Sequence, residues 1–500
     1  MKKIGTTIAF LLLLALSVAQ TPAYAAARQA EETRSNDLEL SSGDWTSLAR
    51  RHPFPYVSGD IADAPPIEKL SKWWEALGDE TLTQLIMASF ANNRDLAAAR
   101  AKVTEARAAL GIGKAAVLPW LDGVNYWTQK KTPKDAGGTG KALDIYRLGL
   151  DASWEIDIFG GKRAAIKAGV ASLEAEHAAL HAAWVTLSSE IAIDYISLRT
   201  LQERLRIAEK NLALQTETFE LLQSKYDAGL INALALNQSR YTVERTKAMI
   251  PTLRTHIEKL ANVLAILIGE VPGSLEALLD ERAPLAKPDL SALVGIPAAT
   301  LRQRPDIRAA ERRLAAQIAR KKSAQADLLP KFHLLGSIGL ESLNTGSLFS
   351  SGGFSFGPRI TWPIFHGSAI RNNIRVQGAR QEQALSAYEG AVLAAVAEVR
   401  DALTAEAQER LRNESLKSGM EAAKTAFAIA DDKYKNGLSD FKNVIDAQSA
   451  LLSFEEEFAV SEGQMLSNMV RLFKALGGGW APLAEAEEPP KSEEKRERTK

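Results

Sequence analysis

One uninterrupted helical stretch limits the folds open to this chain. Glycine and proline are both absent between Gly169 and Gly229, and the helical pattern begins just after Gly160-Gly161. Some 65 residues at about 1.5 Å per residue form a rod of roughly 100 Å. Globular domains rarely hold such a helix, whereas coiled coils and tubular assemblies do. A return helix is expected from Ala233 to Ile268, with Pro251 interrupting and kinking it.

A strand precedes the long helix. In YRLGLDASWEIDIF (146–159) apolar residues occupy every second position and mostly polar residues lie between them. This period of two indicates a half-buried strand. Similar but less regular stretches predict four strands in all, at about 120–129, 145–157, 331–341 and 353–364. Trp127 and Leu335 interrupt the alternation in the first and third of these.

The two halves of the chain resemble each other. NNRDLAAARAKVTEARAALGIGKAAVLPWL aligns without a gap with RQRPDIRAAERRLAAQIARKKSAQADLLPKF, and SKYDAGL aligns with DKYKNGL. The aligned pairs are Asp95 and Asp306, Pro119 and Pro330, Trp154 and Trp362, Tyr226 and Tyr434, and Gly229 and Gly437. Such regular self-similarity predicts an internal duplication. Each half is then a helix (about 81–117 in the first half), two strands, a long helix, a tight turn and a return helix.

The ends of the chain and its middle suggest domain limits. Lys2, Lys3, an apolar segment and Ala23-Tyr24-Ala25 predict a cleaved export signal at 1–25. An extended lead-in is expected at 26–70 and a disordered charged tail at 481–500. The predicted structural repeats are 71–280 and 298–480, joined by a Pro-rich connector at 281–297.

Composition excludes several classes of protein. The chain has no cysteine, which excludes disulfides, thiolate metal sites and a lipid attached to cysteine. Its 61 basic residues balance 61 acidic ones, so nothing favours nucleic-acid binding. No apolar run of 18 residues follows the export signal, so any membrane insertion must use strands.

Membrane insertion would require several copies of the chain. Lipid allows no unpaired sheet edge, and the smallest membrane barrels use about eight strands. Four strands therefore predict a barrel shared between copies, with the apolar face towards lipid and the polar face towards a water-filled pore. An ordinary sheet packed under helices is the alternative. The expected lipid-facing residues are Tyr146, Leu148, Leu150, Trp154, Phe354, Phe356, Ile360 and Trp362.

Three segments carry a family resemblance. LRQRPDIRAAERRLAAQIARKKSAQADLLPKF (301–332), SWEIDIFGGKR (153–163) and KYKNGLSDFKNVIDAQSALLSFEEE (433–457) resemble the TolC-like outer-membrane efflux channels, in the branch that serves resistance-nodulation-division pumps. The resemblance covers about residues 70 to 480. It implies a mainly helical homotrimer with a shared 12-stranded transmembrane β-barrel and a helical tube across the periplasm. It also implies docking to a periplasmic adaptor protein and, through it, to an inner-membrane pump.

The turns at Gly229 and Gly437 correspond to the periplasmic entrance of that family. The resemblance implies a gate at Lys433, Tyr434 and Asp446, where polar contacts keep the entrance closed but reversible. Asp440 would add a ring of like charge in a trimer, and Asp227 is a weaker candidate. The expected adaptor-docking residues are Ala228, Gly229, Leu230, Asn436, Gly437 and Leu438.

Other motifs lack the context that their chemistry needs. GFSFG (353–357) matches a nucleophile elbow but lies within a strand. His177 and His181 share a helical face without a third ligand, so an exposed face is expected rather than a metal site. GGTGK (137–141) is an incomplete P-loop. We therefore expect no cofactor, no metal and no enzyme. A passive efflux duct is the leading hypothesis, and a soluble periplasmic scaffold or adaptor is the alternative.

Overall fold

The computed structural model describes residues 72–137, 140–279, 301 and 303–479. The predicted export signal (1–25), lead-in (26–70), connector (281–297) and charged tail (481–500) all lie outside these described residues. The four predicted strands and the long helices lie within them.

Four antiparallel strands form one sheet in the order β1-β2-β3-β4. They are β1 (Trp120–Lys131), β2 (Ala142–Ile156), β3 (Lys331–Ser342) and β4 (Gly352–Thr361). Short 3₁₀ turns, η3 (Lys134–Ala136) and η6 (Thr345–Ser350), lie between the strands of each pair. The predicted positions are confirmed to within a few residues. The fourth strand ends at Thr361 rather than at 364, because Pro363 cannot donate to the ladder.

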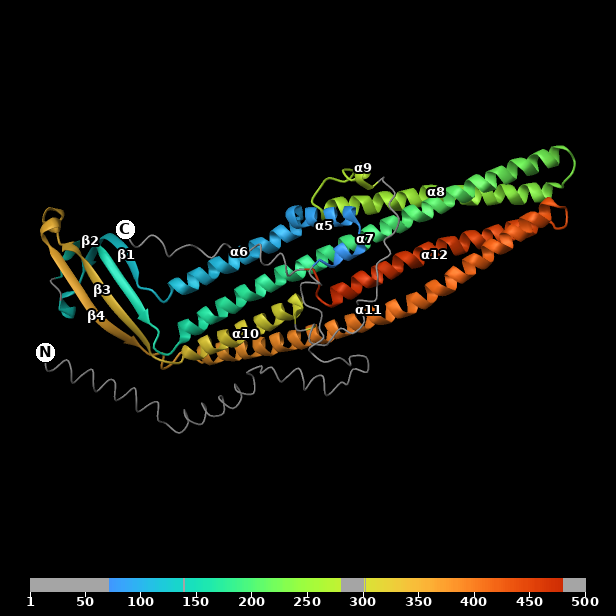
Figure 1. Ribbon diagram of the computed structural model, residues 1–500. Helices are drawn as coiled ribbons and strands as arrows, with labels where there is room; N and C mark the ends of the chain where they lie inside the picture. Colours follow the sequence, from blue (N-terminus) through green and yellow to red (C-terminus); the bar gives the residue numbers. More distant parts are fainter. Residues whose placement is uncertain (1–71, 138–139, 280–300, 302, 480–500) are drawn as a thin grey trace, which may run out of the picture. The chain divides into compact units, whose positions relative to one another are not determined.

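Long helices follow each pair of strands. α7 (Gly161–Asp227) and α11 (Ala369–Lys435) each have 67 residues, and the return helices α8 (Ala233–Leu267) and α12 (Phe441–Ala475) each have 35. In Figure 1, α8 runs back beside α7 and α12 beside α11. The long helices and their hairpins are thus confirmed.

Proline does not interrupt the first return helix, contrary to the prediction. α8 continues through Pro251. A proline removes one backbone N–H, but the remaining helical hydrogen bonds and the packing of Leu253 against Leu205 and Ala208 of α7 hold the segment in place.

The helix predicted at 81–117 is two helices, α5 (Glu80–Asn92) and α6 (Arg94–Ala115). Asn93 between them has an extended backbone (φ −60°, ψ 132°). Its side-chain oxygen accepts from Leu96 N–H at 2.8 Å, which caps α6. Its Nδ2 donates to the carbonyl of Leu267 at the end of α8, at 2.9 Å. These two bonds favour a break that the local helical propensity hides.

The main core lies where α5 and the 3₁₀ turn η2 (Trp73–Leu77) pack against α7 and α12. Trp73 stacks on Phe473 with ring centroids 5.3 Å apart, and Phe90 lies between Trp74 and Trp184. Burial of these large rings stabilises the middle of the helical region. α10 (Pro305–Ala326) packs against α7 and α11, and a short α9 (Glu276–Leu279) follows α8.

Across the part of the chain that the structure describes, no helix combines the length and the apolar character needed to cross a membrane.

Candidate functional site

Strand register gives the sheet one apolar face. Directly paired residues share a face, and Leu150 lies opposite both Gly123 and Ile338, while Ile338 lies opposite Phe354. The same register places these residues together: Leu121, Tyr146, Leu148, Ala152, Trp154, Ile156, Phe332, Leu334, Leu340, Phe356 and Ile360. Several are highly exposed in the single chain; Phe354 is 86% and Phe356 72% exposed. A surface of this kind requires an apolar environment.

Seven of the eight predicted lipid-facing residues therefore share one face. Trp362 follows the end of β4 and has no cross-strand partner. Trp127, which interrupts the alternation in the sequence, lies opposite Tyr146 and belongs to the apolar face. Leu335 lies opposite Ser153 and Gly357 and remains an exception on the polar face.

The opposite face of the sheet is mostly polar, although Trp120, Val124 and Tyr126 of β1 also lie on it. It carries Asp122, Arg147, Asp151, Ser153, Glu155, Lys331, His333, Ser337, Glu341, Ser355, Arg359 and Thr361. Arg147 pairs with Asp151, and the hydroxyls of Ser337 and Ser355 lie 2.9 Å apart. Charges and hydroxyls at this density suit contact with water.

The two helical hairpins close through the same turn. Gly229 (φ 69°) and Gly437 (φ 70°) have left-handed backbones, which favour glycine. The N–H of Leu230 donates to the carbonyl of Lys225 at 2.9 Å, and that of Leu438 to Lys433 at 2.8 Å. These bonds satisfy carbonyls at the helix ends. The leucines are left outside, 73% and 77% exposed.

The ends of the two hairpins pack together in a small apolar cluster, the tip cluster. Its buried members are Leu222, Phe441, Val444 and Ile445. Tyr434 packs at its margin, with its ring centroid 5.2 Å from that of Phe441. The ammonium of Lys225, from the other hairpin, lies 4.8 Å from the centre of the Tyr434 ring. This cation–π contact joins the two hairpins.

Lys225 was not among the predicted site residues. The signal for it is the Lys-Tyr pair that occurs in both halves, as Lys225-Tyr226 and Lys433-Tyr434. The contact itself depends on tertiary packing.

The other predicted gate residues, Lys433, Asp440, Asp446 and Asp227, are exposed. Asp446 accepts from Lys442 at 2.5 Å, and both side chains are more than half exposed. Asp440 precedes α12 without capping it through its side chain, and Asp227 accepts from Gln223 at 2.9 Å. Among the described residues, no hydrogen bond or ion pair connects Lys433, Tyr434 and Asp446 within one chain.

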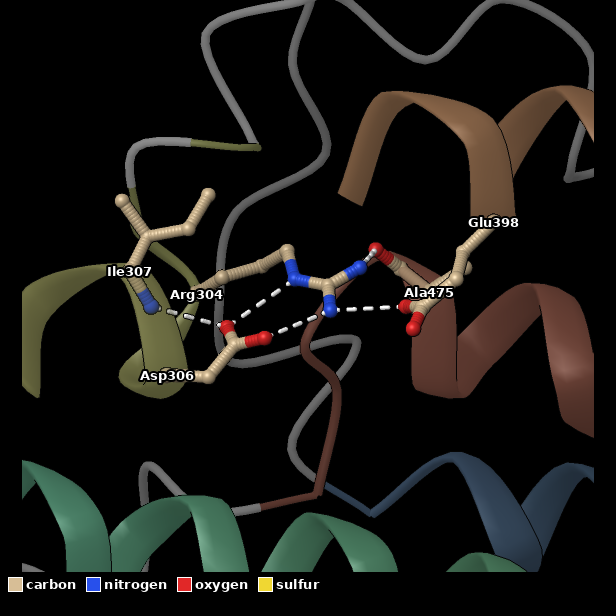
Figure 2. Close-up of polar contacts among 5 residues, drawn as sticks. All are labelled: Arg304, Asp306, Ile307, Glu398 and Ala475. Carbon is tan, nitrogen blue, oxygen red and sulfur yellow. Dashed lines mark hydrogen bonds and ion pairs between the residues drawn. The ribbon is translucent and has the colours of Figure 1, made fainter. Parts of the chain in front are cut away.

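A buried arginine joins three helices near the middle of the molecule (Figure 2). The Arg304 side chain is 7% exposed and donates to both carboxylate oxygens of Asp306, at 3.0 and 2.7 Å. It also donates to Glu398 of α11 at 2.7 Å and to the carbonyl of Ala475 in α12 at 2.7 Å. Burial alone would raise the pKa of Asp306, but the hydrogen bonds and charge of Arg304 hold it below its usual value.

Asn93 occupies the corresponding position in the first half. It precedes α6 as Arg304 precedes α10, and its bond to Leu267 corresponds to the bond of Arg304 to Ala475. The Arg-Pro-Asp segment belongs to the family resemblance, but the sequence alone predicts no role for Arg304. The Arg304–Asp306 pair at the start of α10 can be recognised in the sequence, but Glu398 and Ala475, which Arg304 also binds, are far away in sequence.

The motifs set aside in the sequence lie in ordinary structural surroundings. Ser355 of GFSFG lies in the middle of β4. The sequence predicts an exposed face for His181, and this is wrong. The His181 ring stacks on that of Trp184, with the ring centroids 5.2 Å apart. Burial, with a smaller contribution from His177, lowers the pKa of His181 to about 4. The described residues include no group of three His, Cys, Asp or Glu side chains placed to hold a metal ion.

A sheet with one apolar and one polar face, joined to paired helices of this length, fits a membrane protein with a large helical extension. The chain belongs to the outer membrane efflux protein family, whose sequence model matches residues 85–270 and 296–478.

Its relatives are export channels. The chain is 30% identical to the pyoverdine export outer membrane protein OpmQ of Pseudomonas aeruginosa, over 89% of this chain and 94% of that protein. It is 30% identical to the toluene efflux pump outer membrane protein TtgI of Pseudomonas putida, over 82% and 88%. The solved outer-membrane channel OprN superposes with a TM-score of 0.80 at 32% identity, covering 86% of this chain and 96% of that one. The chain is thus an outer-membrane efflux channel, as predicted, and the scaffold alternative is not supported.

Proposed function

We propose that the chain is the passive exit duct of a tripartite efflux pump, assembled as a homotrimer. The observation that carries this proposal is the pair of open edges on a sheet with an apolar face. Among the described strands, β1 and β4 each pair on one side only. In lipid both edges must be paired, and pairing β4 of one copy with β1 of the next satisfies them. Three copies then supply twelve strands, the number that the family resemblance implies.

Envelope fractionation tests this assembly. The untagged chain is expressed, envelopes are separated by density, and each fraction is run unboiled on a gel. We expect an outer-membrane band far above the 54.2 kDa chain that collapses on boiling. A monomer-sized band that is absent from the outer-membrane fraction would contradict the shared barrel.

We infer that the two halves arose by internal duplication, with repeats at 71–280 and 298–480. The equal helix lengths support this: 67 and 67 residues for α7 and α11, 35 and 35 for α8 and α12, and 22 and 22 for α6 and α10. The matching bonds of Asn93 and Arg304 to the ends of the return helices support it further.

We propose that the hairpin ends form the gate, with Tyr434 at its centre. Its contact with Lys225 adds to the tip cluster that joins the two hairpins, and contacts of this type are worth about 0.5–1 kcal/mol at exposed sites. A seal of this strength is reversible. Lys433, Asp440 and Asp446 are exposed and available to partners on neighbouring copies, and Asp227 plays a smaller part at the first hairpin.

Single-channel conductance tests the gate. In planar bilayers, Tyr434→Ala is expected to raise the conductance of the resting channel severalfold. Tyr226→Ala is the matched control, because it removes the equivalent, exposed tyrosine of the first hairpin. Equal effects of both variants, or none, would refute a special role for Tyr434.

We propose that a periplasmic adaptor protein docks on the two turns, Ala228-Gly229-Leu230 and Asn436-Gly437-Leu438, and links the channel to an inner-membrane pump. The exposed Leu230 and Leu438 support this surface. Because the chain has no cysteine, Leu438→Cys gives a single attachment point for a thiol cross-linker. We expect cross-links to a co-expressed adaptor from that position and none from Lys114→Cys, near the sheet. Cross-links from Lys114→Cys and none from Leu438→Cys would contradict docking at the turns.

A further inference from the structure

A groove between α7, α10 and α11 lies close to the sheet. It holds about 520 Å³. Its floor on α7 consists of small residues, and its polar lining comes from the other two helices. The lining residues are Ala165, Ala168, Gly169, Arg320, Ser323, Ala324, Asp327, Asn373, Gln377 and Arg380. This volume is in the range that accepts a small organic molecule.

The groove continues towards the polar face of the sheet. It shares Ala165, Ser323 and Asp327 with a second cavity, at the junction of helices and strands. Glu155 and Lys331 line that second cavity, and both belong to the polar face. If the polar face borders the pore, the groove opens on the same water-filled path.

Ion pairs at this junction neutralise its acidic groups. Lys162 lies 3.3 Å from Glu155, and Lys331 lies 2.9 Å from Asp327. Arg320 and Arg380 differ: in the described part of the chain, neither forms an ion pair with a carboxylate. Asp327 also lines the groove, but its ion-pair partner is Lys331, so the two arginines keep no carboxylate partner of their own.

Neutral hydrogen bonds hold one of these guanidinium groups in place. Arg320 donates to the hydroxyl of Ser172 at 2.9 Å and to Oε1 of Gln317 at 3.4 Å. Gln317 is buried, and its Nε2 donates to Oε1 of Gln377 at 2.7 Å. This chain of contacts positions Arg320 without neutralising it, and leaves other N–H groups available to a ligand.

We propose that this groove is a low-affinity site for solutes that carry carboxylate or phosphate groups, on the wall of the pore. The inference rests on the proposed pore. Two arginines on different helices can bind separate oxygens of one anionic solute through charge-assisted hydrogen bonds. Because both arginines are exposed to water, the affinity of the groove for the solute stays modest. Weak binding is needed here, since the solute must be released to leave the duct.

Isothermal titration calorimetry with citrate tests the site, using the purified full-length oligomer at low ionic strength. Citrate is the probe because it carries three carboxylates and both arginines line the groove. Arg320→Gln with Arg380→Gln is expected to weaken citrate binding roughly tenfold per arginine. The matched control is Lys322→Gln with Arg371→Gln, which removes the same charge from the same helices outside the groove and should leave binding unchanged.

The outcomes separate this site from the proposed channel. Equal loss in the control variant would mean general charge attraction and would overturn the site, as would absence of citrate binding to the native oligomer. Loss confined to the groove variant would support it. The unboiled-gel band of every variant reports the assembly independently, so a missing oligomer would count against the channel assembly and not against the groove.

Discussion

A charge placed on the apolar face of the sheet should disrupt the channel, whereas the same charge on the polar face should not. Leu150 lies near the middle of β2, opposite Gly123 and Ile338, and is 45% exposed in the single chain. Ser153 lies three residues further along the same strand, on the polar face. Leu150→Arg and Ser153→Arg therefore form a pair that places the same arginine on opposite faces of one strand.

The expected cost follows from the position in the strand. An arginine facing lipid at the bilayer midplane costs about 2–4 kcal/mol, and three copies in one barrel would raise this to about 6–12 kcal/mol per oligomer. Substitutions facing the lumen are tolerated. The assay follows the heat-sensitive oligomer band in urea after insertion into liposomes. We expect Leu150→Arg to abolish the band or strongly lower its urea midpoint, and Ser153→Arg to leave it near the native value. Equal or reversed effects would refute the assignment of the faces.

Three further predictions concern stability. Arg304→Met should cost about 1.5–3 kcal/mol, because it removes the charge-assisted hydrogen bonds to Asp306 and Glu398, whose carboxylates stay partly exposed to water. Urea unfolding of the helical signal measures this cost, and a loss below about 1 kcal/mol would contradict it. His181 has a pKa of about 4 in the folded chain, below its unfolded value near 6.5, so native stability should fall as the pH drops from 6.5 to 4. His181→Phe should reduce that fall in thermal unfolding curves, and an unchanged pH profile would exclude this residue as a cause. Gly463→Leu should destabilise the folded chain by several kcal/mol, because an added Cβ would lie 2.1 Å from the Thr200 hydroxyl oxygen. The measurement is the shift of the thermal unfolding midpoint. Val460→Leu is the control, because it lies at a partly exposed site on the same helix.

Much of the fold could be predicted because its signals are local. Absence of glycine and proline over 170–228 is enough to indicate the long helix, and alternation in 146–156 is enough to indicate its strand. The glycines at 229 and 437 mark turns for the same reason, since their left-handed backbones favour glycine.

Features that depend on partners distant in sequence could not be read in this way. The break at Asn93 is stabilised by a carbonyl at Leu267, and helical propensity on both sides of the break hides it. The role of Arg304 depends on its hydrogen bonds to Glu398 and to the carbonyl of Ala475, which are far away in sequence. Trp127 interrupts the alternation in the sequence of its strand, and only the strand register, which pairs it with Tyr146, shows that it lies on the apolar face.

Different interactions join the helices at the two ends of α12. At the hairpin ends, the cation–π contact of Lys225 with Tyr434, worth about 0.5–1 kcal/mol, adds to the tip cluster, in which Leu222 of one hairpin packs against the buried residues of the other. At the other end of α12, Arg304 is buried and binds Asp306, Glu398 and a helix-terminal carbonyl at once. Breaking that junction would remove these charge-assisted hydrogen bonds together. The opening proposed for the hairpin ends would instead break the tip cluster and the cation–π contact and leave the α10–α12 junction intact.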